Sequence, residues 1–147
     1  MSDPAGWTAE GRLLLGGRAE GDALVLEQPL SFWGGFDSTT GLISDERHPQ
    51  RGQSLAGRVL VMPSGRGSSS SSSVLAEAIR LGTSPAGLLL AEPDGIIVVG
   101  ALIPRLLDGR QCPVVVLDQA TYVRLRSGDR ISIRDARLWV RPRRDSA

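Results

Sequence analysis

The sequence predicts an α+β fold made mostly of short strands, with one main helix. Three observations lead to this prediction. Eighteen glycines and nine prolines divide the 147 residues into many short segments. Most apolar segments are rich in valine, leucine and isoleucine and are too short for a typical helix. Their order mixes closely spaced pairs, typical of hairpins, with a helical stretch, which favours α+β over a regular doubly wound sheet.

Eight apolar segments are expected to form strands. They are Arg12–Leu15, Ala23–Leu26, Arg58–Met62, Leu88–Leu90, Ile96–Val99, Val114–Leu117, Ile131–Ile133 and Leu138–Val140. Turns are expected at residues 16–22, at 92–95 (EPDG) and at 127–129. The last two strands predict a terminal hairpin. Residues 101–107 are expected to form a turn or short helix, and residues 121–125 a brief helix.

The main helix is predicted after the serine run. A buried strand at Arg58–Met62 is interrupted by PSGRGSSSSSS, residues 63–73. Leu75 and Ile79 then recur at helical spacing, and Gly82 is a typical C-terminal residue. Because serine is a favoured N-cap, the helix is expected to begin within the serine run. The segment is therefore a strand, a glycine-rich turn and a helix within one domain.

The segment PLSFWGGFDSTTG, residues 29–41, is expected to be a loop, because it has no periodicity. It contains both phenylalanines of the chain, Phe32 and Phe36, together with Trp33. Loops that concentrate aromatic and glycine residues often form sites. From composition alone, a structured cap over the edge of the core is the simpler explanation.

The composition excludes several mechanisms. All 17 basic residues are arginine, so Schiff-base chemistry, pyridoxal-phosphate attachment and a Walker A lysine are excluded. With Cys112 as its one cysteine, the chain alone can form no disulfide and no cysteine-built zinc or iron–sulfur site. Cys112 precedes an apolar strand and is expected to be buried. His48 is the one candidate histidine base.

Charge and hydropathy point to a single cytoplasmic domain over residues 1–147. The net charge is +1, and the basic cluster Arg141, Arg143 and Arg144 is terminal and has no aromatic stripe, so no nucleic-acid partner is expected. The first residues show no basic and apolar leader. The longest run of apolar residues and glycine, Ile96–Ile103, is far shorter than the roughly 20 residues of a membrane span, so no membrane association is expected.

The turn Gly65–Ser69 is the candidate site. Backbone N–H groups at a helix N-terminus attract anions, so a carboxylate or phosphate is the simplest ligand. The turn is neither a dinucleotide fingerprint, since Ser70 stands where glycine is needed, nor a nucleophile elbow. Ser68 could accept a proton if the helix amides and Arg66 stabilise its alkoxide. The competing interpretation is that the serine is only a helix cap.

Five stretches resemble the small, swivel-domain subunit of the aconitase X family. They are residues 29–41, 48–69, 74–90, 98–109 and 126–133, in the family's order. The strand, Gly-x-Gly-Ser-Ser turn and helix also resemble the swivel domain of aconitase itself, where the first serine after the glycine is the catalytic base. The resemblance implies a compact, swivelling β/β/α domain in which Ser68 is that base.

The resemblance also implies a set of substrate-binding residues around Ser68. They are Arg66, Gly67, Ser69, Trp33, Gly34 and Gly35. Ser69 is additionally expected to act as a helix cap. Aconitases proper carry a substrate-binding arginine where this chain has Ser70. The family often has glycine where Ser71 stands, and the added side chain is expected to stiffen the turn.

In function, the resemblance implies a dehydratase (hydro-lyase) subunit that is active only in a heteromeric complex. A large, cysteine-bearing subunit would carry an iron–sulfur cluster, and this chain would itself bind no cofactor. The partner is expected to cover an apolar, aromatic surface near Phe32 and Trp33. The small hydroxy-acid substrate is expected to be cis-3-hydroxy-L-proline, because the lysine-free composition looks bacterial. Mevalonate 5-phosphate is the alternative.

Two other classes of function remain open. The first is a non-catalytic swivel module that binds a partner or a small anion. The second, a serine hydrolase using His48, is disfavoured because a proline follows His48 and the elbow motif is absent.

Overall fold

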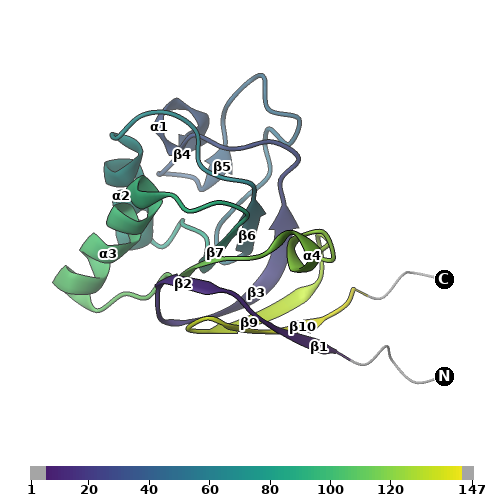
Figure 1. The fold of residues 1–147 in the computed structure, drawn as a ribbon. Coiled ribbons are helices and arrows are strands. Elements are labelled where there is room, and N and C mark those ends of the chain that lie inside the picture. The colour runs from purple at the N-terminus through teal and green to yellow at the C-terminus, as the bar shows by residue number, and fades with distance from the viewer. Residues whose placement is uncertain (1–5, 144–147) are drawn as a thin grey trace.

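A computed structural model describes residues 6–143, which form one eight-stranded sheet flanked by helices (Figure 1). The sheet contains β1 (Trp7–Glu10), β2 (Arg12–Leu15), β3 (Arg18–Val25), β6 (Val59–Met62), β7 (Gly87–Leu90), β8 (Val114–Val116), β9 (Arg130–Arg134) and β10 (Arg137–Arg141). A two-stranded ribbon pairs β4 (Phe36–Asp37) with β5 (Leu42–Ile43). The helices are α1 (Phe32–Gly35), α2 (Ser71–Leu81), α3 (Gly95–Asp108) and α4 (Gln119–Tyr122).

The sheet is nearly closed into a barrel. Its strand order is β1-β10-β9-β3-β6-β7-β8-β2, with β3, β6, β7 and β8 parallel and the other pairs antiparallel. The two outermost strands, β1 and β2, are separated by Gly11 alone, so one bent segment joins both edges. A Cβ at Gly11 would lie 2.5 Å from Val115 Cγ1 and 2.6 Å from the carbonyl oxygen of Val116. The corner therefore requires glycine.

Two apolar cores lie on opposite faces of the central strands. Along β6, Val59 and Val61 belong to the cluster inside the barrel, whereas Leu60 and Met62 belong to the cluster beneath the helices. This alternation follows from the two-residue period of a strand. The second cluster includes Leu75 of α2 and Ile97 of α3, the two helices that lie side by side on one side of the sheet (Figure 1).

The α+β class and most of the strands are confirmed, with two differences at the N-terminal end. Strand β3 begins at Arg18, so most of the turn predicted at residues 16–22 is extended, and β1 was not predicted. The predicted terminal hairpin is the antiparallel pair β9 and β10. The helix predicted after the serine run is α2, and Gly82 ends it with a φ of 82°. The brief helix predicted at residues 121–125 lies slightly earlier, as α4.

The strand predicted at Ile96–Val99 is wrong, because these residues form the start of α3. The side chain of Asp94 accepts hydrogen bonds from the N–H groups of Ile96 and Ile97 and so caps the helix. Gly100 then allows close packing on α2, since a Cβ there would lie 2.9 Å from the carbonyl oxygen of Ser72. Capping and packing override the strand preference of the β-branched residues. The fold therefore has a second long helix beside the expected one.

Within residues 6–143, no helix combines the length and the apolar character needed to cross a bilayer. Arg144 of the predicted basic cluster lies outside the described residues.

Candidate functional site

The candidate site is the turn that leads from β6 into α2. Arg66 and Gly67 are exposed there, and Ser68 is half-buried. Gly67 has a φ of 89°, a conformation that strongly favours glycine. Helix α2 begins at Ser71, three residues after Ser68. The turn thus presents backbone and short side chains beside the positive end of an 11-residue helix.

The hydroxyl of Ser68 is held by the backbone of this turn. The N–H of Ser70 donates to Ser68 Oγ at 3.0 Å, and the N–H of Ser71 donates to the Ser68 carbonyl at 3.0 Å. A backbone N–H aimed at Oγ stabilises negative charge on that atom, as does the helix dipole. The cap predicted at Ser69 is wrong, because Ser70 occupies the N-cap position and Ser68 supplies the accepting hydroxyl.

The segment predicted as a loop, residues 29–41, contains the short helix α1 and strand β4, so that prediction is only partly right. This segment, called the aromatic loop below, lies directly against the turn. The N–H of Arg66 donates to the carbonyl of Leu30 at 3.2 Å, and Leu30 forms an isolated parallel bridge with Gly65. The N–H of Trp33 donates to Ser71 Oγ at 3.1 Å. The structure therefore brings together two segments that are more than 30 residues apart in sequence. The side chain of Ser71 is buried and holds the loop against the start of α2, so its observed contact is with the loop; that it stiffens the turn stays a prediction.

The loop residues differ in their exposure. Trp33 is 58% exposed, and Gly34, with a φ of 85°, has open space around it. Gly35 is buried, and its carbonyl accepts hydrogen bonds from the N–H groups of Ser44 and Asp45, so it holds the loop together. Trp33 and Gly34 are thus the loop residues that could meet a ligand.

A hollow of about 550 Å³ lies beside the loop. It is lined by Phe32, Trp33, Gly34, Phe36, Asp37, Ser38, Ser44 and Val74. The N–H of Thr39 donates to Asp37 and holds the pKa of that carboxyl below its usual value. One wall of the hollow therefore carries a negative charge at neutral pH.

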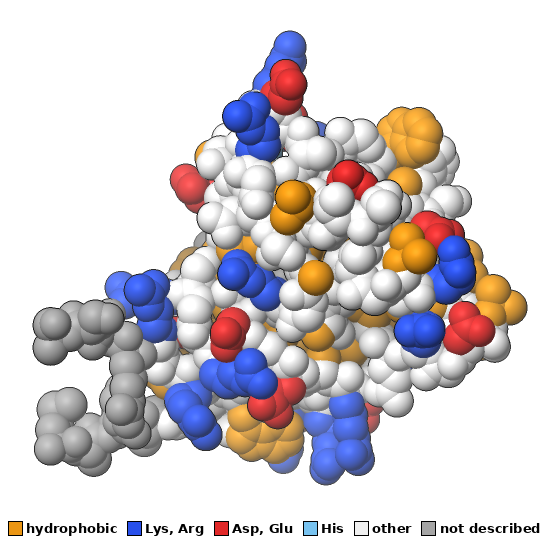
Figure 2. Space-filling view, turned by 180° about the vertical axis from the view of Figure 1, so that it is seen from behind, with side chains coloured by type: hydrophobic (Ala, Val, Ile, Leu, Met, Phe, Trp, Pro, Cys, Tyr) orange, Lys and Arg blue, Asp and Glu red, His pale blue; other side chains and the backbone are white. Residues whose placement is uncertain are grey.

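The apolar surface predicted near Phe32 and Trp33 is reduced to Trp33, because Phe32 is only 1% exposed. Other exposed apolar side chains lie on α2 and α3, including Leu106 and Leu107. Figure 2 shows hydrophobic side chains over these helices, interspersed with charged ones. Exposed apolar side chains thus lie both at the loop and on the helical layer.

Cys112 and His48 both have structural surroundings. Cys112 is buried as predicted, and burial raises the pKa of its thiol to about 12. The ring of His48 is buried, with Nδ1 accepting from the N–H of Gln50 at 3.0 Å and Nε2 lying 3.2 Å from the carbonyl oxygen of Gln28. Among residues 6–143, no three His, Cys, Asp or Glu side chains gather. The described residues do not fit an iron–sulfur cluster.

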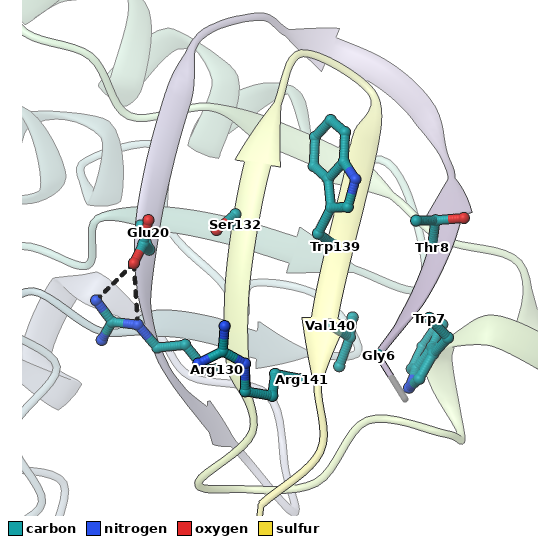
Figure 3. A pocket seen from close by; sticks show the side chains of 9 residues that line it. All are labelled: Gly6, Trp7, Thr8, Glu20, Arg130, Ser132, Trp139, Val140 and Arg141. Carbon is teal, nitrogen blue, oxygen red and sulfur yellow. Dashed lines mark hydrogen bonds and ion pairs between the residues drawn. The ribbon is translucent and has the colours of Figure 1, made fainter. Parts of the chain in front are cut away.

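A separate hollow of about 490 Å³ lies on the outer face of β3, β9, β10 and β1 (Figure 3). Arg130 donates there to Glu20 at 2.9 Å and to Asp22 at 3.3 Å. The hydrogen bond and charge of Arg130 lower the pKa of Glu20. Because these exposed charges neutralise one another, the hollow offers no group prepared for catalysis, and the Ser68 turn is kept as the candidate site.

These features define a swivel-type α+β domain: a curled mixed sheet, two packed helices and a glycine–serine turn at the start of a helix. Comparison with known proteins identifies the family: the aconitase X swivel domain profile matches residues 8–141, and the chain belongs to this family. The resemblance seen in the sequence is confirmed.

The similar proteins include two kinds of dehydratase. The chain is 44% identical over 108 residues to cis-3-hydroxy-L-proline dehydratase of Pseudomonas aeruginosa. The matched region is 74% of this chain but only 19% of that protein. It is 37% identical over 125 residues to the phosphomevalonate dehydratase small subunit of Thermococcus onnurineus, covering 85% of this chain and 90% of the relative. The crystal structure of Thermococcus kodakaraensis aconitase X superposes with a TM-score of 0.79 at 32% identity, over 90% of this chain and 97% of the matched chain.

Sequence reasoning missed Asp94 as a contributor to the site, and it missed the partner of Ser71. The carboxylate of Asp94 accepts from the N–H of Gly65 at 3.1 Å, and Ser71 holds Trp33. A helix-capping signal existed for Asp94, since this acidic residue stands before an apolar run, with only Gly95 between them. Its contact with the turn depends on the tertiary fold and has no local signal.

Proposed function

We propose that this chain is the small subunit of an aconitase X hydro-lyase and that Ser68 is its general base. The observation that carries the proposal is the position of Ser68 Oγ, which receives the Ser70 N–H at the start of α2. Exposed Gly67 lies next to it, and Trp33 is fastened to the same helix start.

The proposed step is removal of a carbon-bound proton. Ser68, as an alkoxide, takes the proton from the substrate; the electron pair of the broken C–H bond forms the new C=C bond, and hydroxide leaves from the adjacent carbon. The Ser70 N–H and the dipole of α2 stabilise the alkoxide before transfer. Gly67 lets the substrate approach the turn closely, because it has no side chain.

Arg66 supplies the positive charge of the turn in this proposal. Its side chain is exposed, while its backbone N–H is fixed on Leu30. A guanidinium can hold a carboxylate through two parallel hydrogen bonds, which would orient a hydroxy acid over Ser68. Trp33 and Gly34 are proposed to close the other side of the substrate, with Ser69 beside it.

The remaining part of the active site is proposed to lie on a large, cysteine-bearing partner. Any iron–sulfur cluster belongs there, since the described residues of this chain do not fit one. The partner would cover Trp33 and the apolar side chains of α2 and α3.

For the substrate, we propose cis-3-hydroxy-L-proline. The 44% identity to the dehydratase of Pseudomonas aeruginosa supports this choice. Mevalonate 5-phosphate is the second candidate, supported by the match to 90% of the length of a separate phosphomevalonate dehydratase small subunit.

The test is reconstitution with a cysteine-bearing aconitase X chain from the same organism, followed by assays of water loss from both substrates. The complex is expected to convert cis-3-hydroxy-L-proline, and the purified small subunit alone is expected to be colourless and inactive. Turnover by the isolated chain would contradict the divided site. A stable complex that converts neither substrate would favour a non-catalytic swivel module.

A further inference from the structure

Asp94 uses its two carboxylate oxygens for different parts of the fold. Oδ1 accepts hydrogen bonds from the N–H groups of Ile96 at 3.0 Å and Ile97 at 3.2 Å, which is ordinary capping of α3. Oδ2 accepts from the N–H of Gly65 at 3.1 Å, 29 residues earlier in the chain. This second bond joins the cap of α3 to the turn that carries Ser68.

Gly65 is the residue that makes this contact possible. A Cβ at this position would lie 2.6 Å from Asp94 Oδ2 and 3.0 Å from Ile97 Cδ1. Any side chain would therefore push the carboxylate away from the backbone. Gly65 also forms the bridge with Leu30, so the beginning of the turn is held between the aromatic loop and α3.

The anchor itself is rigid. Asp94 is fixed by two N–H groups of a 14-residue helix, and Gly100 of that helix packs closely against Ser72 of α2. The turn from Gly65 to Ser70 thus spans two points that are linked by the packing of α3 on α2: the Asp94 carboxylate and the start of α2. A base held in this way keeps its position when substrate enters.

We propose that Asp94 is a positioning residue for Ser68, acting through Gly65. This inference rests on the proposed function of Ser68. Loss of the bond between Oδ2 and the Gly65 N–H would leave the beginning of the turn held by its contacts with Leu30 alone. A misplacement of about 1 Å at a reacting group can cost roughly 100-fold in rate, so the effect belongs to kcat rather than to substrate affinity.

Asp94→Asn separates the two roles of the carboxylate. The amide has one oxygen, and asparagine caps helices about as well as aspartate, so the oxygen is expected to stay on Ile96 and Ile97. The amide NH₂ then faces the Gly65 N–H and cannot accept from it. In the reconstituted complex, we expect kcat to fall roughly 10- to 100-fold, with a much smaller change in KM and little change in Tm.

Asp118→Asn is the matched control. Asp118 caps α4 by accepting from the N–H of Thr121 at 2.8 Å, so this variant makes the same charge change at another helix start. Its kcat is expected to match that of the wild type. A fall equal to that of Asp94→Asn would assign the effect to lost charge or lost capping and overturn the proposal.

Amide hydrogen exchange of the full-length chain, measured by NMR, gives a readout without substrate. In Asp94→Asn, the Gly65 amide is expected to exchange faster while those of Ile96 and Ile97 stay protected. Unchanged Gly65 protection, loss of protection in α3, or an unchanged kcat would each overturn the proposal. Measuring kcat of Ser68→Ala distinguishes failure of the proposed function from failure of this inference. A wild-type kcat for Ser68→Ala would show that Ser68 is not the base, whereas exchange of the Gly65 amide tests the Asp94 contact independently.

Discussion

Replacing Ser68 by alanine should remove most of the activity and little of the stability. The hydroxyl accepts one backbone hydrogen bond, at 3.0 Å, in a half-buried position. Such a bond contributes about 0.5–1.5 kcal/mol to the free energy of unfolding. For a chain of 147 residues, each kcal/mol corresponds to roughly 2–4 °C in Tm. We therefore expect Tm to fall by only a few degrees.

The expected loss of activity is much larger. General-base catalysis typically contributes 10²–10⁴-fold, or about 3–5.5 kcal/mol of activation free energy. The assay is steady-state kinetics of the reconstituted complex, with Tm measured on the same preparations. Ser69→Ala is the comparison variant. Ser69 is exposed and is proposed to lie beside the substrate without acting as the base, so its kcat is expected to fall much less than that of Ser68→Ala. A near wild-type kcat for Ser68→Ala would refute the reasoning and place the base on the partner.

Three further predictions concern the loop, the barrel corner and the buried thiol. Trp33→Ala should lower kcat/KM at least tenfold while Tm falls by only a few degrees. Trp139→Ala removes a similarly exposed tryptophan from the outer face of the sheet and should leave kcat/KM unchanged. Equal losses in the two variants would contradict a role for the loop. Gly11→Ala should lower the free energy of unfolding by about 1–3 kcal/mol through overpacking. Gly95 has open space around it, so Gly95→Ala should not lower it. The free energy of unfolding of both variants is measured by urea denaturation. Burial raises the pKa of the Cys112 thiol from 9.0 to about 12 in the folded chain. Between pH 9 and 12 the folded chain therefore keeps this proton and the unfolded chain releases it. The stabilising effect of the thiol is complete below pH 9 and is lost between pH 9 and 12. The stability difference between wild type and Cys112→Ala should therefore shrink by about 1.4 kcal/mol per pH unit above pH 9, and a constant difference would contradict the burial argument.

The unit from β6 through the turn to α2 could be predicted from sequence because its signals are local. Strand pattern, glycine and proline breaks, helical spacing and Gly82 all lie within about 25 consecutive residues. Strand β1 gave no such signal, since four alternating residues are too few to recognise without their partner β10. The apolar run Ile96–Val99 reads equally well as a buried strand or a buried helix. Residues 96–99 are helical because Asp94 caps the helix and α3 packs against α2.

The candidate site depended more strongly on tertiary structure. Ser68 was found through the resemblance and the helix start, both of which are visible in the sequence. The contact of the aromatic loop with the turn arises from the bridge between Leu30 and Gly65, which joins segments with no shared local pattern. The surface covered by the partner was expected near both Phe32 and Trp33, but Phe32 packs edge-to-face on Phe36 in the core. Composition identifies such a loop and cannot say which of its aromatic rings points outward.

The pairing of Trp7 with Val140 brings the two ends of the described chain side by side. Figure 1 shows these strand ends on the side of the molecule away from α2. A polypeptide tethered to either end would therefore leave the domain from one place, without crossing the Ser68 turn. Gene fusion or gene splitting at this point demands no rearrangement of the barrel. This geometry suits a family in which the same domain matches 19% of one long dehydratase and 90% of a separate small subunit.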